Sequence, residues 1–122
     1  MAEYTVSVII PAYNAEDHLG EAIASALEQS WPETQVTVVD DGSEDDSLAV
    51  ARGFEARGVE VLSIQNSGAT AARNVGMERA NGDYIQYLDA DDVLGERKIE
   101  RQVELLENAP GQCLASCGWG KF

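Results

Sequence analysis

The chain has 122 residues, of which 44% are hydrophobic, so it is long enough for one domain with its own core. Its 22 acidic and 8 basic residues give a formal net charge of -14, which makes nucleic acid a poor partner and disfavours docking on anionic lipid. No apolar run approaches the ~18 residues of a transmembrane helix, and the first residues lack the basic and apolar regions of a signal peptide. A cytoplasmic protein is therefore expected, in which Cys113 and Cys117 are reduced thiols.

Short apolar runs alternate with helical patterns along the chain. The apolar runs predict strands at residues 6–10, 36–39, 59–64, 84–88 and 114–117. Helical patterns lie between them, from Asn14 to Leu27, from Ser43 or Asp45 to Gly58, from Ala69 to Ala80 and from Glu96 to Glu107. Asn14 is the expected cap of the first helix, and Gly82 suits the end of the third. The alternation predicts an α/β fold, with an open, mostly parallel sheet and helices on both faces, as a single domain over residues 1–122.

Three of the predicted strands end in residues with unusual chemistry. These ends are Pro11-Ala12-Tyr13-Asn14, Asp40-Asp41-Gly42-Ser43 and Asp89-Ala90-Asp91-Asp92. In open parallel sheets, ligands bind beyond the carboxyl ends of the strands. We therefore expect two acidic clusters and an aromatic side chain to converge on one rim of the sheet.

Asp89 and Asp91 stand one residue apart after a predicted strand, so a turn would bring both carboxylates into one small volume. Their mutual repulsion favours a counter-cation, and Mg²⁺ and Mn²⁺ bind such carboxylates together with the oxygens of a diphosphate. The triplet is a candidate clamp for a metal-bound diphosphate. A solvated loop without a metal has the same pattern, because such triplets are common in loops.

Three more residues have a functional and a structural interpretation. Asp41 could accept hydrogen bonds from a nucleobase or ribose, or the Asp40-Asp41 pair could stabilise the start of a helix. Tyr13 could stack on a base or pack in the core. Arg73 could contact a nucleotide and its diphosphate or make a surface salt bridge.

The segments VSVIIPAYNAEDHLGEAIASALEQS, VTVVDDGSEDDS and NSGATAARNVGMERANGDYIQYLDADD, in this order, resemble the start of family 2 glycosyltransferases. The resemblance implies the GT-A fold, with a Rossmann-like half that binds the donor. It also implies a nucleotide-diphospho-sugar donor, with a UDP-sugar as first expectation, and a divalent cation, Mn²⁺ or Mg²⁺. The sugar would pass with inversion to a hydroxyl of a saccharide or lipid-linked acceptor, in cell wall or polysaccharide biosynthesis.

The resemblance also implies roles for individual residues. The positions that match its nucleoside-binding residues are Pro11, Ala12, Tyr13 and Asp41. Arg73 matches a position in the donor pocket, and Asp89-Ala90-Asp91 matches the metal-binding motif. Within that motif, the resemblance makes Asp91 the direct metal ligand, while Asp89 contacts the ribose or a metal-bound water.

The resemblance places the general base well beyond the Asp-x-Asp motif. We therefore expect this base after Phe122, in an acceptor-binding part that the sequence stops before, and assign no catalytic residue within the chain. The full-length protein could work at the inner face of the membrane. Apolar surface near Leu114 and Trp119 is expected to be left uncovered, which favours a homodimer.

Other classes of protein remain as alternatives. A signalling receiver domain would carry its acid pair after the first strand, where this chain has Pro-Ala-Tyr-Asn. A nucleotidyltransferase would carry a glycine-rich and basic loop at the same place. The third alternative is a non-catalytic module that binds a sugar nucleotide.

Overall fold

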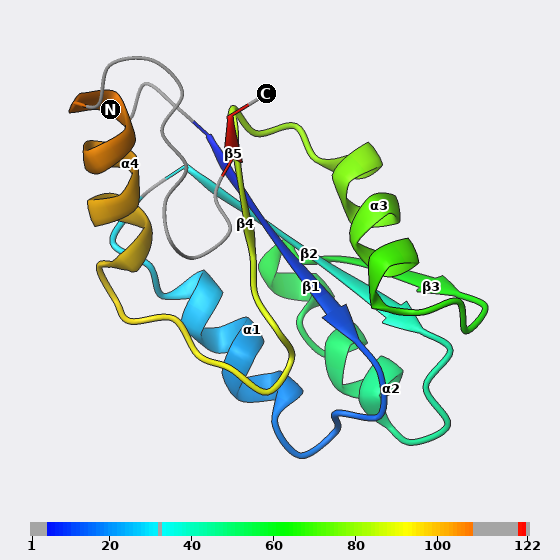
Figure 1. Ribbon diagram of the computed structural model, residues 1–122. Helices are drawn as coiled ribbons and strands as arrows, with labels where there is room; N and C mark the ends of the chain where they lie inside the picture. Colours follow the sequence, from blue (N-terminus) through cyan, green and yellow to red (C-terminus); the bar gives the residue numbers. More distant parts are fainter. Residues whose placement is uncertain (1–4, 32, 109–119, 122) are drawn as a thin grey trace.

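The structure is a computed structural model that describes residues 5–31, 33–108 and 120–121 (Figure 1). The strands are β1 (Val6–Ala12), β2 (Thr34–Asp41), β3 (Glu60–Ile64), β4 (Tyr84–Tyr87) and β5 (Gly120–Lys121). The helices are α1 (Leu19–Leu27), α2 (Ser47–Arg52), α3 (Ala69–Arg79) and α4 (Lys98–Asn108), with a short 3-10 helix at Glu55–Arg57. Strands and helices alternate as predicted.

The five strands form one sheet in the order β3-β2-β1-β4-β5. β1 pairs in parallel with β2 and β4, and β2 pairs in parallel with β3. β5 pairs antiparallel with β4. The prediction of an open, mostly parallel sheet is therefore confirmed.

Helices cover both faces of the sheet (Figure 1). On one face, the large core cluster joins alternate residues of β1, such as Val8 and Ile10, to Leu19 and Ile23 of α1 and Ile99 of α4. On the other face lies α3, where Gly76 sits directly above Ile9 and Val39. The side chains of β1 therefore point alternately to two cores, which explains why this strand is almost continuously apolar.

β1 extends through Pro11 to Ala12, two residues further than predicted. A proline is tolerated in this central strand because pairing with β4 covers only Val6 to Ile9. The carbonyl of Ile9 accepts a hydrogen bond from the N–H of Leu88, so the backbone groups of Ile9 face β4. Pro11, two residues further along, faces the same side but lies beyond the last residue that pairs with β4. The N–H that proline lacks would have had no strand partner there.

Two local predictions were wrong. Asn14 does not cap α1, which begins at Leu19, and instead adopts a left-handed backbone with φ of 48°. Gly82 does not follow α3 in a left-handed conformation, because the helix ends at Ala80 in an extended conformation. Gly82 is required by packing instead: a Cβ atom there would lie 2.7 Å from both the backbone nitrogen and the hydroxyl of Ser7.

Several predictions concern residues outside the described part of the chain. They are the strand at 114–117, the thiols Cys113 and Cys117, and the apolar surface near Leu114 and Trp119. Among the described residues, no helix is both long and apolar enough to cross a membrane.

The contact between α3 and the sheet predicts opposite effects for two glycine substitutions. Gly76→Ala should lower the free energy of unfolding by about 1–3 kcal/mol, because its methyl group would clash with Ile9 and this overpacking outweighs the gain in helix propensity. Gly20→Ala, in α1, should leave stability unchanged or raise it by up to ~1 kcal/mol, since its nearest new contact is an ordinary 3.8 Å to Val50. Urea unfolding of both variants measures the difference. Equal stability of the two variants would contradict the close packing of α3.

Candidate functional site

The carboxyl ends of β1, β2 and β4 meet at one rim, where they surround a cavity of about 370 Å³. The residues that line it are Pro11, Ala12, Tyr13, Asn14, Ala15, His18, Asp41, Ala69, Ala72, Asp89, Ala90 and Asp91. The structure thus brings together all the site residues expected from the sequence except Arg73. It adds Asn14, which the sequence had placed at this rim without a role, and Ala15, His18, Ala69 and Ala72, which no sequence signal had marked.

The cavity has an apolar floor and an aromatic group at its mouth. Ala12 and Ala72 are buried, and Ala90 is only 7% exposed. Tyr13 is 49% exposed, so the alternative that it packs in the core is wrong. A flat apolar ligand could lie against this ring, because an exposed aromatic at a cavity mouth offers a stacking face.

Asp41 is buried at the end of β2 and holds the turn that precedes α3. Its Oδ1 accepts from the N–H of Ser67 at 2.8 Å, and its Oδ2 accepts from the N–H of Gly68 at 3.0 Å. The side-chain amide of Asn66 donates to the Asp41 carbonyl at 2.9 Å. The bonds from Ser67 and Gly68 use one lone pair on each carboxylate oxygen, and each oxygen has a second lone pair. The carboxylate therefore supports the start of α3. Asp41 also lines the cavity, so a ligand there would lie next to it.

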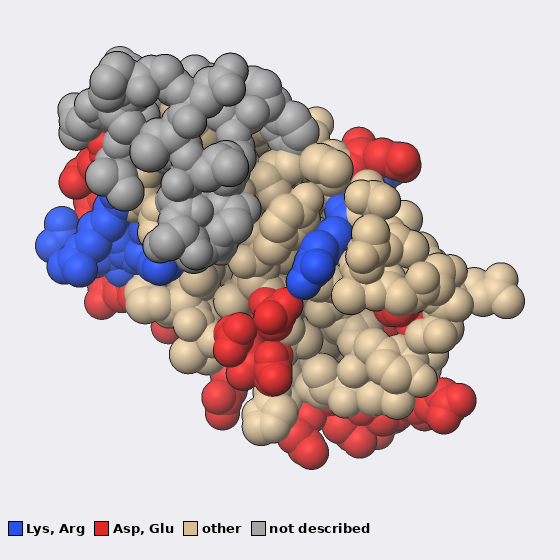
Figure 2. All heavy atoms as spheres, in the orientation of Figure 1, with Lys and Arg blue, Asp and Glu red and all other residues tan. Residues whose placement is uncertain are grey.

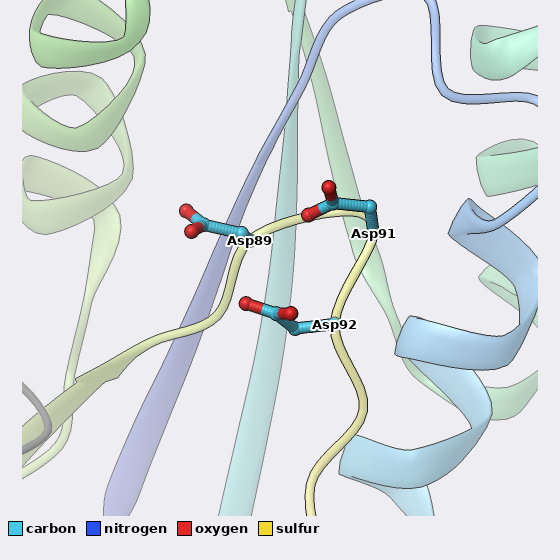
Figure 3. Close-up of side chains that lie close together, drawn as sticks. All are labelled: Asp89, Asp91 and Asp92. Carbon is cyan, nitrogen blue, oxygen red and sulfur yellow. The ribbon is translucent and has the colours of Figure 1, made fainter.

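Three carboxylates converge on the loop after β4. Oxygens of Asp89, Asp91 and Asp92 all lie within 4.8 Å of one another, and all three residues are exposed. Figure 3 shows them on one turn of the chain, with the carboxylates of Asp91 and Asp92 directed toward the side on which Asp89 lies. The N–H of Asp92 donates to the carbonyl of Asp89 at 3.0 Å, and this turn brings Asp92 back beside Asp89. The sequence placed Asp92 at this rim but did not include it among the metal ligands, although its position directly after Asp91 was a usable signal.

Arg73 lies beside this cluster but lines a neighbouring cavity. Its guanidinium approaches the Asp89 carboxylate at 3.5 Å and stands 5.8 Å from the centroid of the Tyr87 ring. The second cavity, of about 550 Å³, shares Asp89 with the first. The salt bridge considered from the sequence therefore exists, but its partner belongs to the candidate site. In the face shown in Figure 2, a small basic patch meets acidic side chains near the middle of the surface.

The geometry can be compared with known proteins. The family model described as Glycosyl transferase family 2 matches residues 7–118. The chain belongs to glycosyltransferase family 2. Membership in this family confirms the resemblance drawn from the sequence. It rules out the receiver-domain and nucleotidyltransferase alternatives.

Relatives of this family 2 chain include bacterial glycosyltransferases. An uncharacterized glycosyltransferase of Haemophilus influenzae is 38% identical over 104 residues, which cover 83% of this chain and 42% of the relative. The Escherichia coli UDP-Glc:alpha-D-GlcNAc-diphosphoundecaprenol beta-1,3-glucosyltransferase WfgD is 34% identical over 107 residues, which cover 87% of this chain and 42% of the relative. The chain thus spans about two fifths of the length of these relatives.

Solved structures support the fold assignment. Residues 1–349 of Staphylococcus aureus TarS, in complex with UDP-GlcNAc, superpose with a TM-score of 0.79 and 26% identity. The match covers 92% of this chain and 37% of the TarS chain. The family 2 chain therefore has the GT-A fold that the resemblance implied.

The role of Asp41 in the turn before α3 predicts a structural cost for its removal. Asp41→Ala should lower the free energy of unfolding by roughly 1–3 kcal/mol, because it leaves the N–H groups of Ser67 and Gly68 without their acceptor. Asp46→Ala serves as the control, since Asp46 is exposed and its side chain caps no helix. Urea unfolding compares the two. If both variants unfold like the unmutated chain, Asp41 does not support this turn.

Proposed function

We propose that residues 1–122 bind the donor of a family 2 glycosyltransferase, and that the whole protein moves a sugar from a nucleotide-diphosphate donor to an acceptor hydroxyl with inversion. The observation that carries the proposal is the cavity that joins Tyr13 and Asp41 to Asp89 and Asp91. One end offers an aromatic face and a carboxylate, and the other offers an acidic cluster. A nucleoside diphosphate has the matching order of groups, with a base and ribose followed by two phosphates.

The relatives support a UDP-sugar as donor. The E. coli relative is named as an enzyme that uses UDP-Glc, and the TarS structure is a complex with UDP-GlcNAc. The proposed roles follow the geometry. Tyr13 stacks on the base, Pro11 and Ala12 shape the nucleoside pocket, and Asp41 accepts from the base or ribose.

A divalent cation fits the acidic end of the cavity. Asp91 and Asp89 would hold it, with Asp92 within reach, because three exposed carboxylates within 4.8 Å repel one another without a cation. Mn²⁺ and Mg²⁺ prefer oxygen ligands of this kind. When bound, such an ion stabilises the negative charge that develops on the diphosphate leaving group.

Arg73 is a basic residue that lies next to the acidic cluster. Its guanidinium orients the Asp89 carboxylate at 3.5 Å, and it is near enough to the cluster to contact a diphosphate held there. The ring of Tyr87 lies against the same guanidinium, 5.8 Å from ring centroid to guanidinium carbon, which is within the range of a cation–π contact. Arg73 thereby pairs with one candidate metal ligand and adds positive charge next to the acidic cluster.

The first functional prediction is that binding of UDP depends on a divalent cation. Calorimetric titration of the chain with UDP in Mn²⁺ should show binding that excess chelator weakens at least tenfold, because the phosphates would otherwise face the carboxylates. Equal affinity with Mn²⁺ and with chelator would show that the cluster does not act through a metal.

The second prediction separates the two ends of the cavity. Asp91→Ala should abolish the Mn²⁺-dependent part of UDP binding, whereas Tyr13→Ala should weaken binding of UDP and of uridine alike, with or without the metal. Glu28→Ala, at the far end of α1, is the matched control and should bind as the unmutated chain does. Identical Mn²⁺ titrations for Asp91→Ala and Glu28→Ala would refute the metal assignment.

The third prediction concerns the transfer step. We propose that the general base lies outside residues 1–122, as the family resemblance implies. A chain extended to the length of the relatives should transfer sugar at least ~10²-fold faster than residues 1–122, because a base typically contributes 10²–10⁴ in rate. Equal rates would place the base inside this sequence. Donor binding without transfer by the extended chain would favour a non-catalytic sugar-nucleotide-binding module.

A further inference from the structure

The loop between β1 and α1, residues 13–18, forms one wall of the cavity and carries Tyr13. It makes side-chain hydrogen bonds to the loop between β2 and α2, residues 42–46, and to Ser47, the first residue of α2. The N–H groups of three consecutive residues donate to this segment. Asn14 donates to Ser43 Oγ at 2.9 Å, Ala15 to Ser47 Oγ at 2.7 Å, and Glu16 to Asp45 Oδ2 at 3.2 Å. In return, the N–H of Glu44 donates to Asn14 Oδ1 at 2.8 Å.

The backbone of Asn14 explains why these N–H groups need partners. Its left-handed conformation, with φ of 48°, delays the start of α1 until Leu19. A left-handed residue in such a turn directs consecutive N–H groups to one side and creates a concave site that attracts negative charge. Here the protein supplies the charge itself, through the carboxylate of Asp45.

Asp45 and Ser47 act as one unit. Ser47 is fully buried, and its hydroxyl accepts from Ala15 while it donates to Asp45 Oδ1. The N–H of Ser47 also donates to Asp45 Oδ1 at 2.9 Å. The hydroxyl of Ser47 and the N–H groups of Ser47 and Glu16 hold the pKa of the Asp45 carboxyl below its usual value, so the residue is charged when it accepts these bonds.

We infer that Asp45 and Ser47 are positioning residues for the nucleoside end of the cavity. They touch no ligand in this assignment. By accepting hydrogen bonds from the N–H groups of Ala15 and Glu16, they hold the wall behind Tyr13 in one conformation, so that binding requires little ordering of the loop. The inference rests on the proposed function, because it assigns Tyr13 to the nucleoside.

The first test compares UDP binding in Mn²⁺ for three variants. Ser47→Ala and Asp45→Asn should each raise the Kd for UDP about tenfold, as expected when a preformed wall must be ordered on binding. Asp46→Asn, which removes the neighbouring exposed charge, should leave the Kd unchanged. The Kd for Mn²⁺ alone should stay the same in all three, since the acidic cluster lies on the loop after β4.

The second test asks whether these residues act through Tyr13. In a Tyr13→Ala background, Asp45→Asn should change the Kd for UDP less than twofold, because the ring that it positions is gone. Additive effects of the two substitutions would overturn the positioning role, since a general loss of structure would weaken both backgrounds equally. If Ser47→Ala fails to fold, Asp45→Asn, which keeps the shape of the side chain, carries both tests.

Amide hydrogen exchange without ligand tests the bonds themselves. The N–H groups of Asn14, Ala15 and Glu16 should be protected in the unmutated chain and should exchange faster in Asp45→Asn. Unprotected amides in the unmutated chain would overturn the inference. Protected amides in a chain that does not bind UDP would contradict the proposed function instead, so the two failures are distinguishable.

Discussion

The parallel pairing of β1 with β2 on one side and β4 on the other is the constraint on which the site depends. It places the carboxyl ends of three strands at one rim. Pairing with β4 stops at Ile9, whereas β1 continues to Ala12. The end of β1 and the loop after β4 therefore stand apart, and the cavity lies between them. A register with equal strand ends would have closed this space with backbone hydrogen bonds.

The acidic residues of the rim form two groups, which differ in whether backbone N–H groups donate to their carboxylates. Asp41 and Asp45 accept hydrogen bonds from backbone N–H groups, so their negative charge stabilises turns of the protein. Asp89, Asp91 and Asp92 are exposed, and in the described part of the chain the ion pair at this cluster is the contact of Arg73 with Asp89. The charge left over is therefore concentrated at one end of the cavity, where a cation would be most stabilised.

The two ends of the cavity also differ in how firmly they are held. The wall that carries Tyr13 is tied to the β2–α2 segment, and Asp41 is tied to the turn before α3. In the acidic loop the carboxylates of Asp89, Asp91 and Asp92 are exposed, whereas Ala90 is buried and the N–H of Leu94 donates to Ser25 Oγ. The end at Tyr13 is thus held by hydrogen bonds to neighbouring segments, whereas the exposed carboxylates of the acidic end keep more rotational freedom.

The sequence alone determined the α/β class, the parallel sheet and most of the candidate site, because strand periodicity and the residues after each strand are local properties of the chain. Strand ends were less accurate, since β1 could continue through Pro11 only because β4 stops pairing at Ile9. Contacts between distant segments were decided by the tertiary structure. Asn14 is a left-handed residue rather than a cap, and its N–H donates to Ser43 of a distant loop. Gly82 is required because its backbone lies close to Ser7. The grouping of Asp92 with Asp89, the pairing of Arg73 with that carboxylate and the internal roles of Asp41 and Asp45 depend on distances that only folding sets.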